Sequence, residues 1–233
     1  DNLTLWDSPG LGDSPKADQR YANEISALLK KKDARGDLLI DAAVVILDAY
    51  TREYGTTYQI IDKILFPVLG KDKRIILAIN RCDMALGGRY WNYNTGEPEA
   101  PLISRWIELA QSVRQRMRLS LGADFDPIVY SATEHYNIAK LLSEMVDGIP
   151  EEKRYLLASA LRSNPEVWKR GEEVEKHTER VVKKVESSIN RALEGAALGA
   201  AAGAKIGSLI PVIGTAVGAG VGAALGFFGN LKK

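Results

Sequence analysis

Three short polar segments carry the residue types with which this chain could do chemistry, and each follows an apolar stretch. They are DSPG at 7–10, NRCD at 80–83 and SAT at 131–133. Ligands of open α/β sheets bind beyond the carboxyl ends of the strands, and each segment would begin at such an end. A lone Asp-x-x-Gly is common by chance, but three such segments in this order are much more specific. The pattern therefore favours one nucleotide site built from all three.

The elements that would position these segments alternate along the first 150 residues. Apolar runs predict strands at 3–6, 38–49, 74–80 and 127–132, and helical spacing predicts helices at 18–32, 57–69, 103–120 and 136–146. The runs at 38–49 and 74–80 are typical of strands buried on both faces. This alternation predicts an α/β fold with a parallel sheet and helices on both faces. Residues 84–102, rich in glycine, asparagine and aromatic residues, are expected to form a surface loop that packs on the body.

The composition narrows the class of protein. The chain has 233 residues and a net charge of +1, which gives no indication of a broad nucleic-acid surface. An apolar content of 45% supports a hydrophobic core. The single cysteine, Cys82, excludes an internal disulfide and fits a reducing compartment such as the cytoplasm. His135 and His177 lack partners at metal-ligand spacing, so both are expected to be structural or solvent-facing.

Together the three segments resemble the motifs of the Era/TrmE branch of the P-loop GTPases. DSPG is similar to that family's Asp-x-x-Gly motif, NRCD to its Asn-Lys-x-Asp guanine motif, and SAT to its final Ser-Ala motif. The likeness covers residues 1–150 and looks closest to prophage-encoded Era-like GTP-binding proteins. It implies a GTPase-type domain over 1–150, with GTP or GDP and Mg²⁺ as ligands.

On the base side, the resemblance implies that Asp83 accepts two hydrogen bonds from N1 and N2 of guanine, a pair that adenine cannot offer. Such charge-assisted bonds contribute about 1.5–3 kcal/mol each. Asn80 would brace the loop, and the backbone N–H of Ala132, next to Ser131, would meet guanine O6. Arg81 replaces the family's lysine over the base, and its flat guanidinium can also stack on a ring.

On the phosphate side, the resemblance implies that Asp7 holds Mg²⁺ through water and that the N–H of Gly10 senses a γ-phosphate. Leu11 stands where Ras-type enzymes place a water-orienting glutamine, so hydrolysis would need another group. The polar residues of 48–57 could line the phosphates, but none is assigned. The family's phosphate loop, G-x-x-x-x-G-K-[ST], does not occur in the sequence and would lie upstream of Asp1, as would the threonine of the first switch.

Without that loop, the expected site keeps the residues that would bind the base and loses those that would hold the phosphates. Hydrogen bonds worth ~5 kcal/mol must offset an association cost of at least about 4 kcal/mol, which leaves millimolar affinity at best. Hydrolysis by this chain alone is expected to be negligible, because phosphoryl transfer depends on positioning and charge neutralisation. The family's central strand would be missing too, which leaves the inner edges of the strands ending near Asp7 and Asp48 unpaired unless these two strands pair directly, so we expect a weakened or rearranged sheet.

The composition changes twice after Pro150. Residues 151–194 are expected to be a charged helical region, with helices at 151–163 and 165–194. In 195–229, glycine recurs every fourth residue on both sides of Pro211, which predicts a glycine-zipper helical hairpin. Each arm is shorter than the roughly 20 residues that cross a bilayer. The hairpin would either associate with a membrane, the slightly favoured reading, or pack against the body or another copy.

Two functions from different classes remain open. The first is a GTP-binding protein of the Era-like class that is defective in phosphate binding and hydrolysis. The second is a non-catalytic membrane-associating or protein-interaction protein with a remnant GTPase domain. Ribosomal or RNA partners are implied by the resemblance alone. Taken singly, each of the three segments is equally compatible with an ordinary turn, loop or helix cap.

Overall fold

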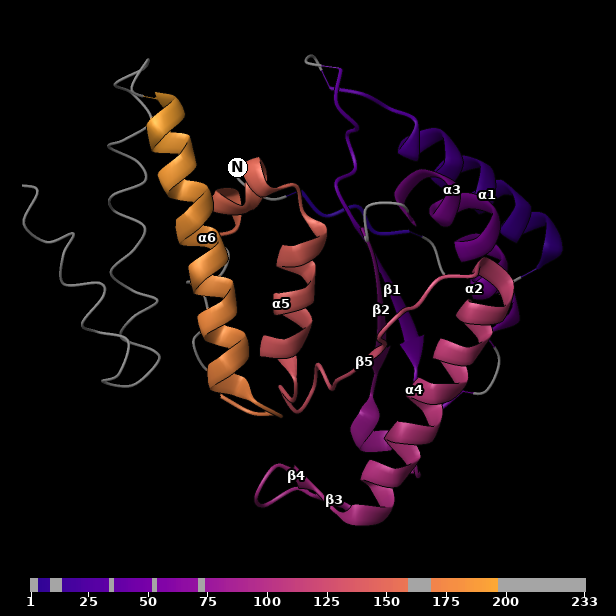
Figure 1. The fold of residues 1–233 in the computed structure, drawn as a ribbon. Helices are drawn as coiled ribbons and strands as arrows, with labels where there is room; N and C mark the ends of the chain where they lie inside the picture. Colours follow the sequence, from indigo (N-terminus) through magenta and orange to yellow (C-terminus); the bar gives the residue numbers. More distant parts are fainter. Residues whose placement is uncertain are drawn as a thin grey trace, which may run out of the picture.

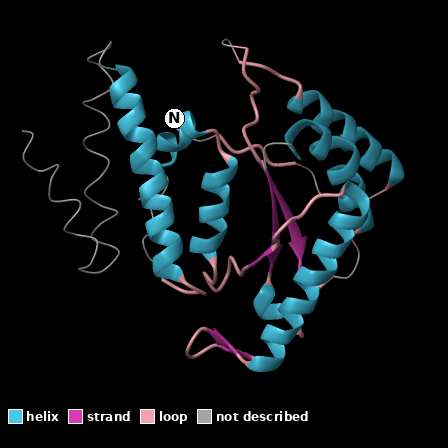
Figure 2. Ribbon diagram, viewed as in Figure 1, coloured by secondary structure: helices cyan, strands magenta, loops and turns pink. Residues whose placement is uncertain are grey.

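The computed structural model describes residues 4–8, 14–33, 36–51, 54–70, 74–158 and 169–196. Strands and helices alternate over the first 150 residues, as predicted (Figures 1 and 2). The main elements are α1 (Pro15–Leu29), β1 (Ala43–Asp48), α2 (Gly55–Ile60), α3 (Phe66–Leu69), β2 (Ile75–Asn80), α4 (Ala100–Leu121), β5 (Ile128–Val129), α5 (Ile138–Gly148) and α6 (Val174–Ala196). Shorter elements are the π-helical η1 (Ile61–Leu65), the 3₁₀ turns η3 (Cys82–Met84) and η4 (Glu151–Ala158), and the strands β3 (Trp91–Asn92) and β4 (Glu97–Pro98).

The central sheet is parallel, with the strand order β1-β2-β5. Asp48 lies opposite Asn80, and Ile79 lies opposite Val129, so the three strands end almost level with one another. Strand β2 lies in the middle, and all its residues before Asn80 are buried. The predicted parallel α/β sheet is therefore confirmed.

Helices cover both faces of this sheet, as predicted (Figure 1). On one face, side chains of α1, η1 and α4 pack against alternate residues of β1 and β2. On the other face, Ile76, Ala78 and Ile128 pack against Leu141 of α5. Strand β2 is therefore covered on both faces.

The predicted strand at 3–6 is not formed by the residues described there. Residues 4–8 take no part in a sheet, and Leu5 and Trp6 are exposed, Leu5 by 78%. A strand is stabilised when its backbone groups pair with a neighbour, and this segment pairs with no described strand. The prediction rested on a four-residue apolar pattern, which is too short to specify pairing.

The prediction that 38–49 is buried on both faces is wrong. The strand β1 covers only Ala43–Asp48, and its burial is incomplete: Leu47 is buried, whereas Ile46 is 59% exposed. Among the described residues, β1 pairs only with β2 and lies at the edge of the sheet. The expected weakening or rearrangement of the sheet stays a prediction, and among the described residues no strand lies beyond β1.

Helix α1 begins three residues before its predicted start at 18. The Ser14 hydroxyl oxygen accepts a hydrogen bond from the Ala17 N–H at 3.2 Å, and Pro15 occupies the first turn. A serine cap followed by proline favours a helix start at this point. The predicted helix at 57–69 forms as α2, η1 and α3. The π-helical turn η1 precedes Pro67, whose ring is incompatible with a regular α-helical turn at the residue four positions earlier.

The predicted loop at 84–102 contains the β3–β4 hairpin and gives way to α4 at Ala100. The hairpin residue Trp91 is buried, which confirms that the loop packs on the body. The predicted helix at 103–120 is confirmed within α4, although Ile103 and Ile107 lie on its exposed side.

The charged helix predicted from 165 begins only at Val174. Before it, Gly171 and Glu173 have φ of +132° and +48°, values that a right-handed helix excludes. Gly171 is required for a further reason, because a Cβ there would collide with the side chain and backbone of Asn137. In the 151–163 region, the described residues form 3₁₀ turns over 151–158.

Helix α6 packs beside α5, so the chain after residue 150 joins the body (Figure 1). Arg180 and Lys184 both pair with Asp147 of α5, and the Ser188 hydroxyl donates to the Glu151 carbonyl at 2.6 Å. The buried apolar side chains of α6 are Val181, Val182, Val185 and Ile189.

Among the described helices, none has both the length and the apolar character needed to cross a bilayer. The glycine-zipper hairpin predicted at 195–229 lies outside the described residues, apart from the last two residues of α6.

Candidate functional site: the loops after β2 and β5

The loops that follow β2 and β5 are joined by one side chain, that of Asn80. Its Oδ1 accepts a hydrogen bond from the Arg81 N–H at 2.8 Å and another from the Ala132 N–H at 3.1 Å. Asn80 ends β2, and Ala132 lies 52 positions further along the chain. The structure thus brings NRCD and SAT together at one edge of the sheet. The Ala132 N–H, which we expected to face guanine O6, is used here by Asn80.

Asp83 is the most unusual polar residue of this edge. It lies in the 3₁₀ turn η3, and only 4% of its surface is exposed. Its Oδ1 has no hydrogen-bond partner among the described residues. A buried acceptor without a partner costs about 1–3 kcal/mol, and more when it is charged. Such groups are rare in folded proteins and call for a specific explanation.

Arg81 adopts a left-handed backbone conformation, with φ of +60°. Its guanidinium donates to Asp48 Oδ2 at 2.9 Å and lies 5.7 Å from the ring centre of Tyr50. Asp48 Oδ1 in turn accepts from the Tyr50 N–H at 2.9 Å. Arg81, which we expected over a guanine ring, is therefore held against the loop that follows β1.

Sequence reasoning assigned no residue of the segment 48–57, and the structure singles out Asp48, Tyr50 and Tyr54 there. The Tyr54 hydroxyl donates to the Asp48 carbonyl at 2.5 Å. Burial, followed by the nearby Tyr58 and Asp48, raises the pKa of Tyr54 to about 12. The signal in the sequence was an acid at a strand end, with two tyrosines close behind.

An aromatic cluster lies next to the NRCD loop and is hydrogen-bonded to it. Trp91, Trp106 and Tyr136 pack together, with ring centres 5.3–6.4 Å apart. The Trp106 indole N–H donates to the Cys82 carbonyl at 2.8 Å. This bond fixes the peptide unit directly before Asp83. The sequence placed Trp106 only within the helix predicted at 103–120.

Cys82 and Ser131 act as structural parts of these loops. Burial raises the pKa of the Cys82 thiol above its usual range, so the thiol stays protonated and unreactive. Its N–H donates to the Tyr130 carbonyl at 3.1 Å, which ties the two loops together again. Ser131 is fully buried, and its hydroxyl oxygen accepts from the Glu134 N–H at 3.1 Å.

The phosphate side of the expected site is not assembled by the described residues. Asp7 is exposed on a segment outside the sheet, so it does not end a strand beside Asn80. Gly10 lies outside the described residues. No group of three or more His, Cys, Asp or Glu side chains in the described part could hold a metal ion. The described residues therefore bring together no such set of ligands for Mg²⁺.

The geometry defines a class of fold, a parallel α/β sheet with its polar residues gathered where the strands end. Comparisons of the chain with protein-family models, curated proteins and solved structures found no match.

Proposed function

We propose that this chain binds the base of a guanine nucleotide at the loops after β2 and β5. The observation that carries the proposal is Asp83, a buried carboxylate whose Oδ1 lacks a partner among the described residues. Guanine offers N1–H and N2–H side by side, which a carboxylate can accept together. The resemblance of NRCD and SAT to guanine-binding motifs supports the same assignment.

Base binding requires a small change at Asp83, because Oδ1 is closed to solvent. Rotation of this side chain toward the edge would expose the carboxylate and relieve the cost of an unpaired buried acceptor. Asn80 keeps the two loops in register during this change through its bonds to both. Arg81 would stack on the base only after leaving Asp48, and that ion pair is exposed enough to be weak.

The proposal covers binding and does not extend to hydrolysis. The expected affinity is millimolar, since hydrogen bonds to the base must offset the association cost without a phosphate clamp. Weak binding that prefers guanine over adenine is therefore the property to measure.

Equilibrium dialysis of GDP, GTP and ATP against the chain tests this proposal. We expect GDP and GTP to bind, ATP to bind at least about tenfold more weakly, and Asp83→Ala to remove the preference, because one charged hydrogen bond contributes about 1.5–3 kcal/mol. Asp83→Asn is the matched control: its amide carries one donor and one acceptor, so it should favour xanthine nucleotides over guanine nucleotides. Equal binding of GTP and ATP, or a preference that survives Asp83→Ala, would refute the proposal.

A further inference from the structure

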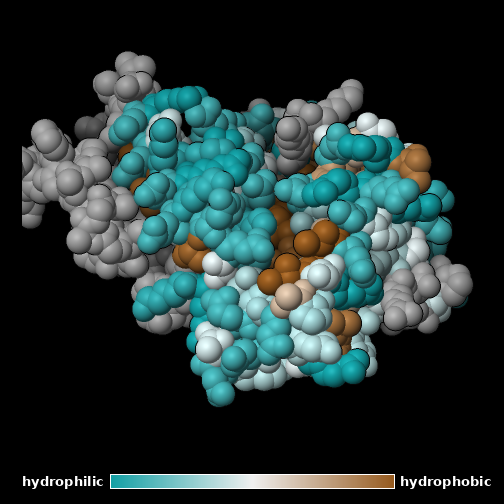
Figure 3. Space-filling view, turned by 60° about the horizontal axis from the view of Figure 1, so that its bottom comes forward, coloured by the Kyte–Doolittle hydropathy of each residue, from teal (hydrophilic) through white to brown (hydrophobic). Residues whose placement is uncertain are grey.

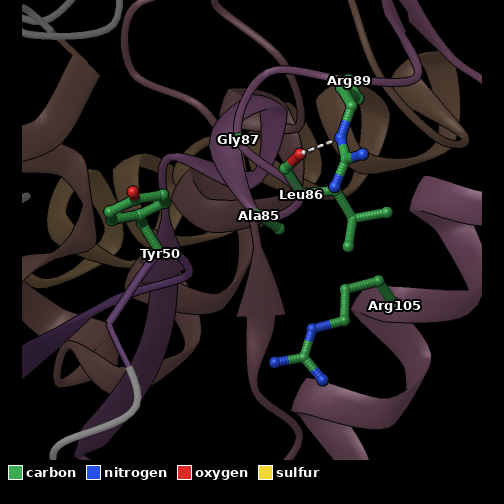
Figure 4. A pocket seen from close by; sticks show the side chains of 6 residues that line it. All are labelled: Tyr50, Ala85, Leu86, Gly87, Arg89 and Arg105. Carbon is green, nitrogen blue, oxygen red and sulfur yellow. Dashed lines mark hydrogen bonds between the residues drawn. The ribbon is translucent and has the colours of Figure 1, made fainter.

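A hollow opens beside the NRCD loop, on the side of α4. Its volume is about 530 Å³, and it is lined by Tyr50, Ala85, Leu86, Gly87, Arg89 and Arg105. This is within the size range of small-molecule sites, roughly 300–1,000 Å³. Figure 4 shows the side chains of Arg89 and Arg105 reaching toward this space from the loop and from α4, with Tyr50 on the opposite wall.

The lining is positively charged. Two guanidiniums from different elements converge on the hollow, and none of its lining residues is acidic. Arg89 donates to the Leu86 carbonyl at 3.2 Å, and Arg105 donates to Glu108 at 3.2 Å. The Glu108 side chain is 66% exposed, so this ion pair compensates little of the charge. Most of the donors of both guanidiniums remain available for a ligand.

The opposite wall is an aromatic ring. Tyr50 is 61% exposed, although its N–H is fixed by Asp48 and Arg81 lies near its ring. An exposed ring provides a flat surface on which a ligand ring can stack. Viewed toward the end where the strands finish, the molecular surface is mainly hydrophilic around a hydrophobic central area (Figure 3).

The turn that contains Gly87 also leaves space in the hollow for a ligand. Gly87 has φ of +68°, and a Cβ built there would meet no atom within 4 Å. The left-handed conformation favours glycine, while the open space on its side-chain face keeps the hollow accessible.

We propose that this hollow binds a small organic phosphate that carries a flat ring, such as a mononucleotide. Its phosphate would lie between Arg89 and Arg105, whose planar donor groups match phosphate oxygens. Its ring would stack on Tyr50. The site is separate from Asp83, so the proposal stands whether or not that residue reads guanine.

Binding of AMP and of inorganic pyrophosphate, measured by titration calorimetry, tests this site. AMP suits the test because adenine lacks the donor pair that Asp83 would need. We expect AMP to bind with a Kd of roughly 0.1–1 mM, and pyrophosphate to bind about fivefold or more weakly because it cannot stack. Arg89→Gln and Arg105→Gln should each weaken AMP binding roughly tenfold or more. Tyr50→Ala should remove the advantage of AMP over pyrophosphate.

Arg118→Gln is the matched control, since Arg118 lies on the same helix and pairs with Asp124 away from the hollow. An unchanged AMP affinity is expected for this variant. Independently of mutation, AMP should protect Arg89 and Arg105, but not Arg118, from modification by phenylglyoxal.

Three results would overturn the proposal. The first is the absence of saturable AMP binding up to about 10 mM, a concentration at which even very weak sites fill. The second is binding that Arg89→Gln and Arg105→Gln leave intact. The third is equal loss in the Arg118→Gln control, which would indicate a diffuse charge effect. Because the hollow would take up ATP and GTP alike, the base preference at Asp83 is measured in the Arg89→Gln, Arg105→Gln double variant, so that the two proposals are tested separately.

Discussion

The stabilisation that the Trp106–Cys82 hydrogen bond provides can be measured by comparing substitutions of Trp106 and of its neighbour Trp91. Trp91 and Trp106 pack against each other, and each is only 4% exposed. The Trp106 N–H donates to Cys82 at 2.8 Å, whereas the Trp91 N–H has no partner among the described residues. Replacing each by phenylalanine removes the same atoms in similar surroundings, so the two variants differ mainly in the hydrogen bond.

The magnitude follows from what each variant gains and loses. In Trp106→Phe the Cys82 carbonyl keeps one bond, from the Ala85 N–H at 3.2 Å, so the net loss is about 1 kcal/mol. In Trp91→Phe a buried unpaired donor disappears, which relieves about 1 kcal/mol or more. Both variants also lose apolar contact and leave a cavity, and these costs largely cancel in the comparison. We therefore expect Trp106→Phe to be less stable than Trp91→Phe by about 2 kcal/mol.

Urea unfolding followed by far-ultraviolet circular dichroism measures this difference. With an m value of about 3 kcal/mol/M, the two midpoints should differ by roughly 0.7 M. Equal midpoints, or a less stable Trp91→Phe, would refute the reasoning that the Trp106 bond fixes the NRCD loop.

Two further predictions concern the ion pair at the strand ends and the buried histidine. Asp48→Ala should lower the free energy of unfolding by less than about 1 kcal/mol, because the Asp48 and Arg81 side chains are 36% and 47% exposed; a loss above about 2 kcal/mol in urea unfolding would contradict this. His177 is 7% exposed, and burial lowers its pKa, with Lys140 of α5 acting in the same direction and Glu173, 4.0 Å away, acting against it. Because the pKa of His177 is lower in the folded chain, the unfolded chain binds the proton more readily. The stabilising contribution of neutral His177 is therefore complete above the ordinary histidine pKa of about 6.5. It is lost as the pH falls from that value toward the lowered pKa of the folded chain. Urea unfolding should therefore show a larger loss of stability between pH 7.5 and pH 5.5 for the unmodified chain than for His177→Leu, and parallel pH profiles would contradict the assignment.

Of the two strands predicted to be buried on both faces, the one that proved right lies in the middle of the sheet. The run 74–80 forms β2 and is buried through Ile79, because a central strand must be apolar on both sides. The run 38–49 has the same apolar character, yet β1 leaves Ile46 exposed. An apolar run specifies that a strand can be buried; whether both of its faces are covered depends on its neighbours in the sheet.

The site shows the same division between local pattern and tertiary contact. The order and placement of NRCD and SAT indicated that the two would meet, because the carboxyl ends of parallel strands lie together. The ion pair of Arg81 with Asp48 could not be read from the sequence, since the two residues are 33 positions apart and the pairing depends on the register of β1 with β2. For the same reason, the convergence of Arg89 and Arg105 beside Tyr50 was not foreseen.

By itself, the sequence determined the alternation of strands and helices, the parallel α/β class and the position of two polar loops at strand ends. Apolar periodicity is a local property, and it is enough to choose between strand and helix. Tertiary structure alone decided that residues 4–8 stay outside the described sheet, that buried Asp83 has an oxygen without a partner among the described residues, and that Trp106 hydrogen-bonds to the NRCD loop. Each of these depends on which backbone and side-chain groups find partners at long sequence separation, and no local pattern carries that information.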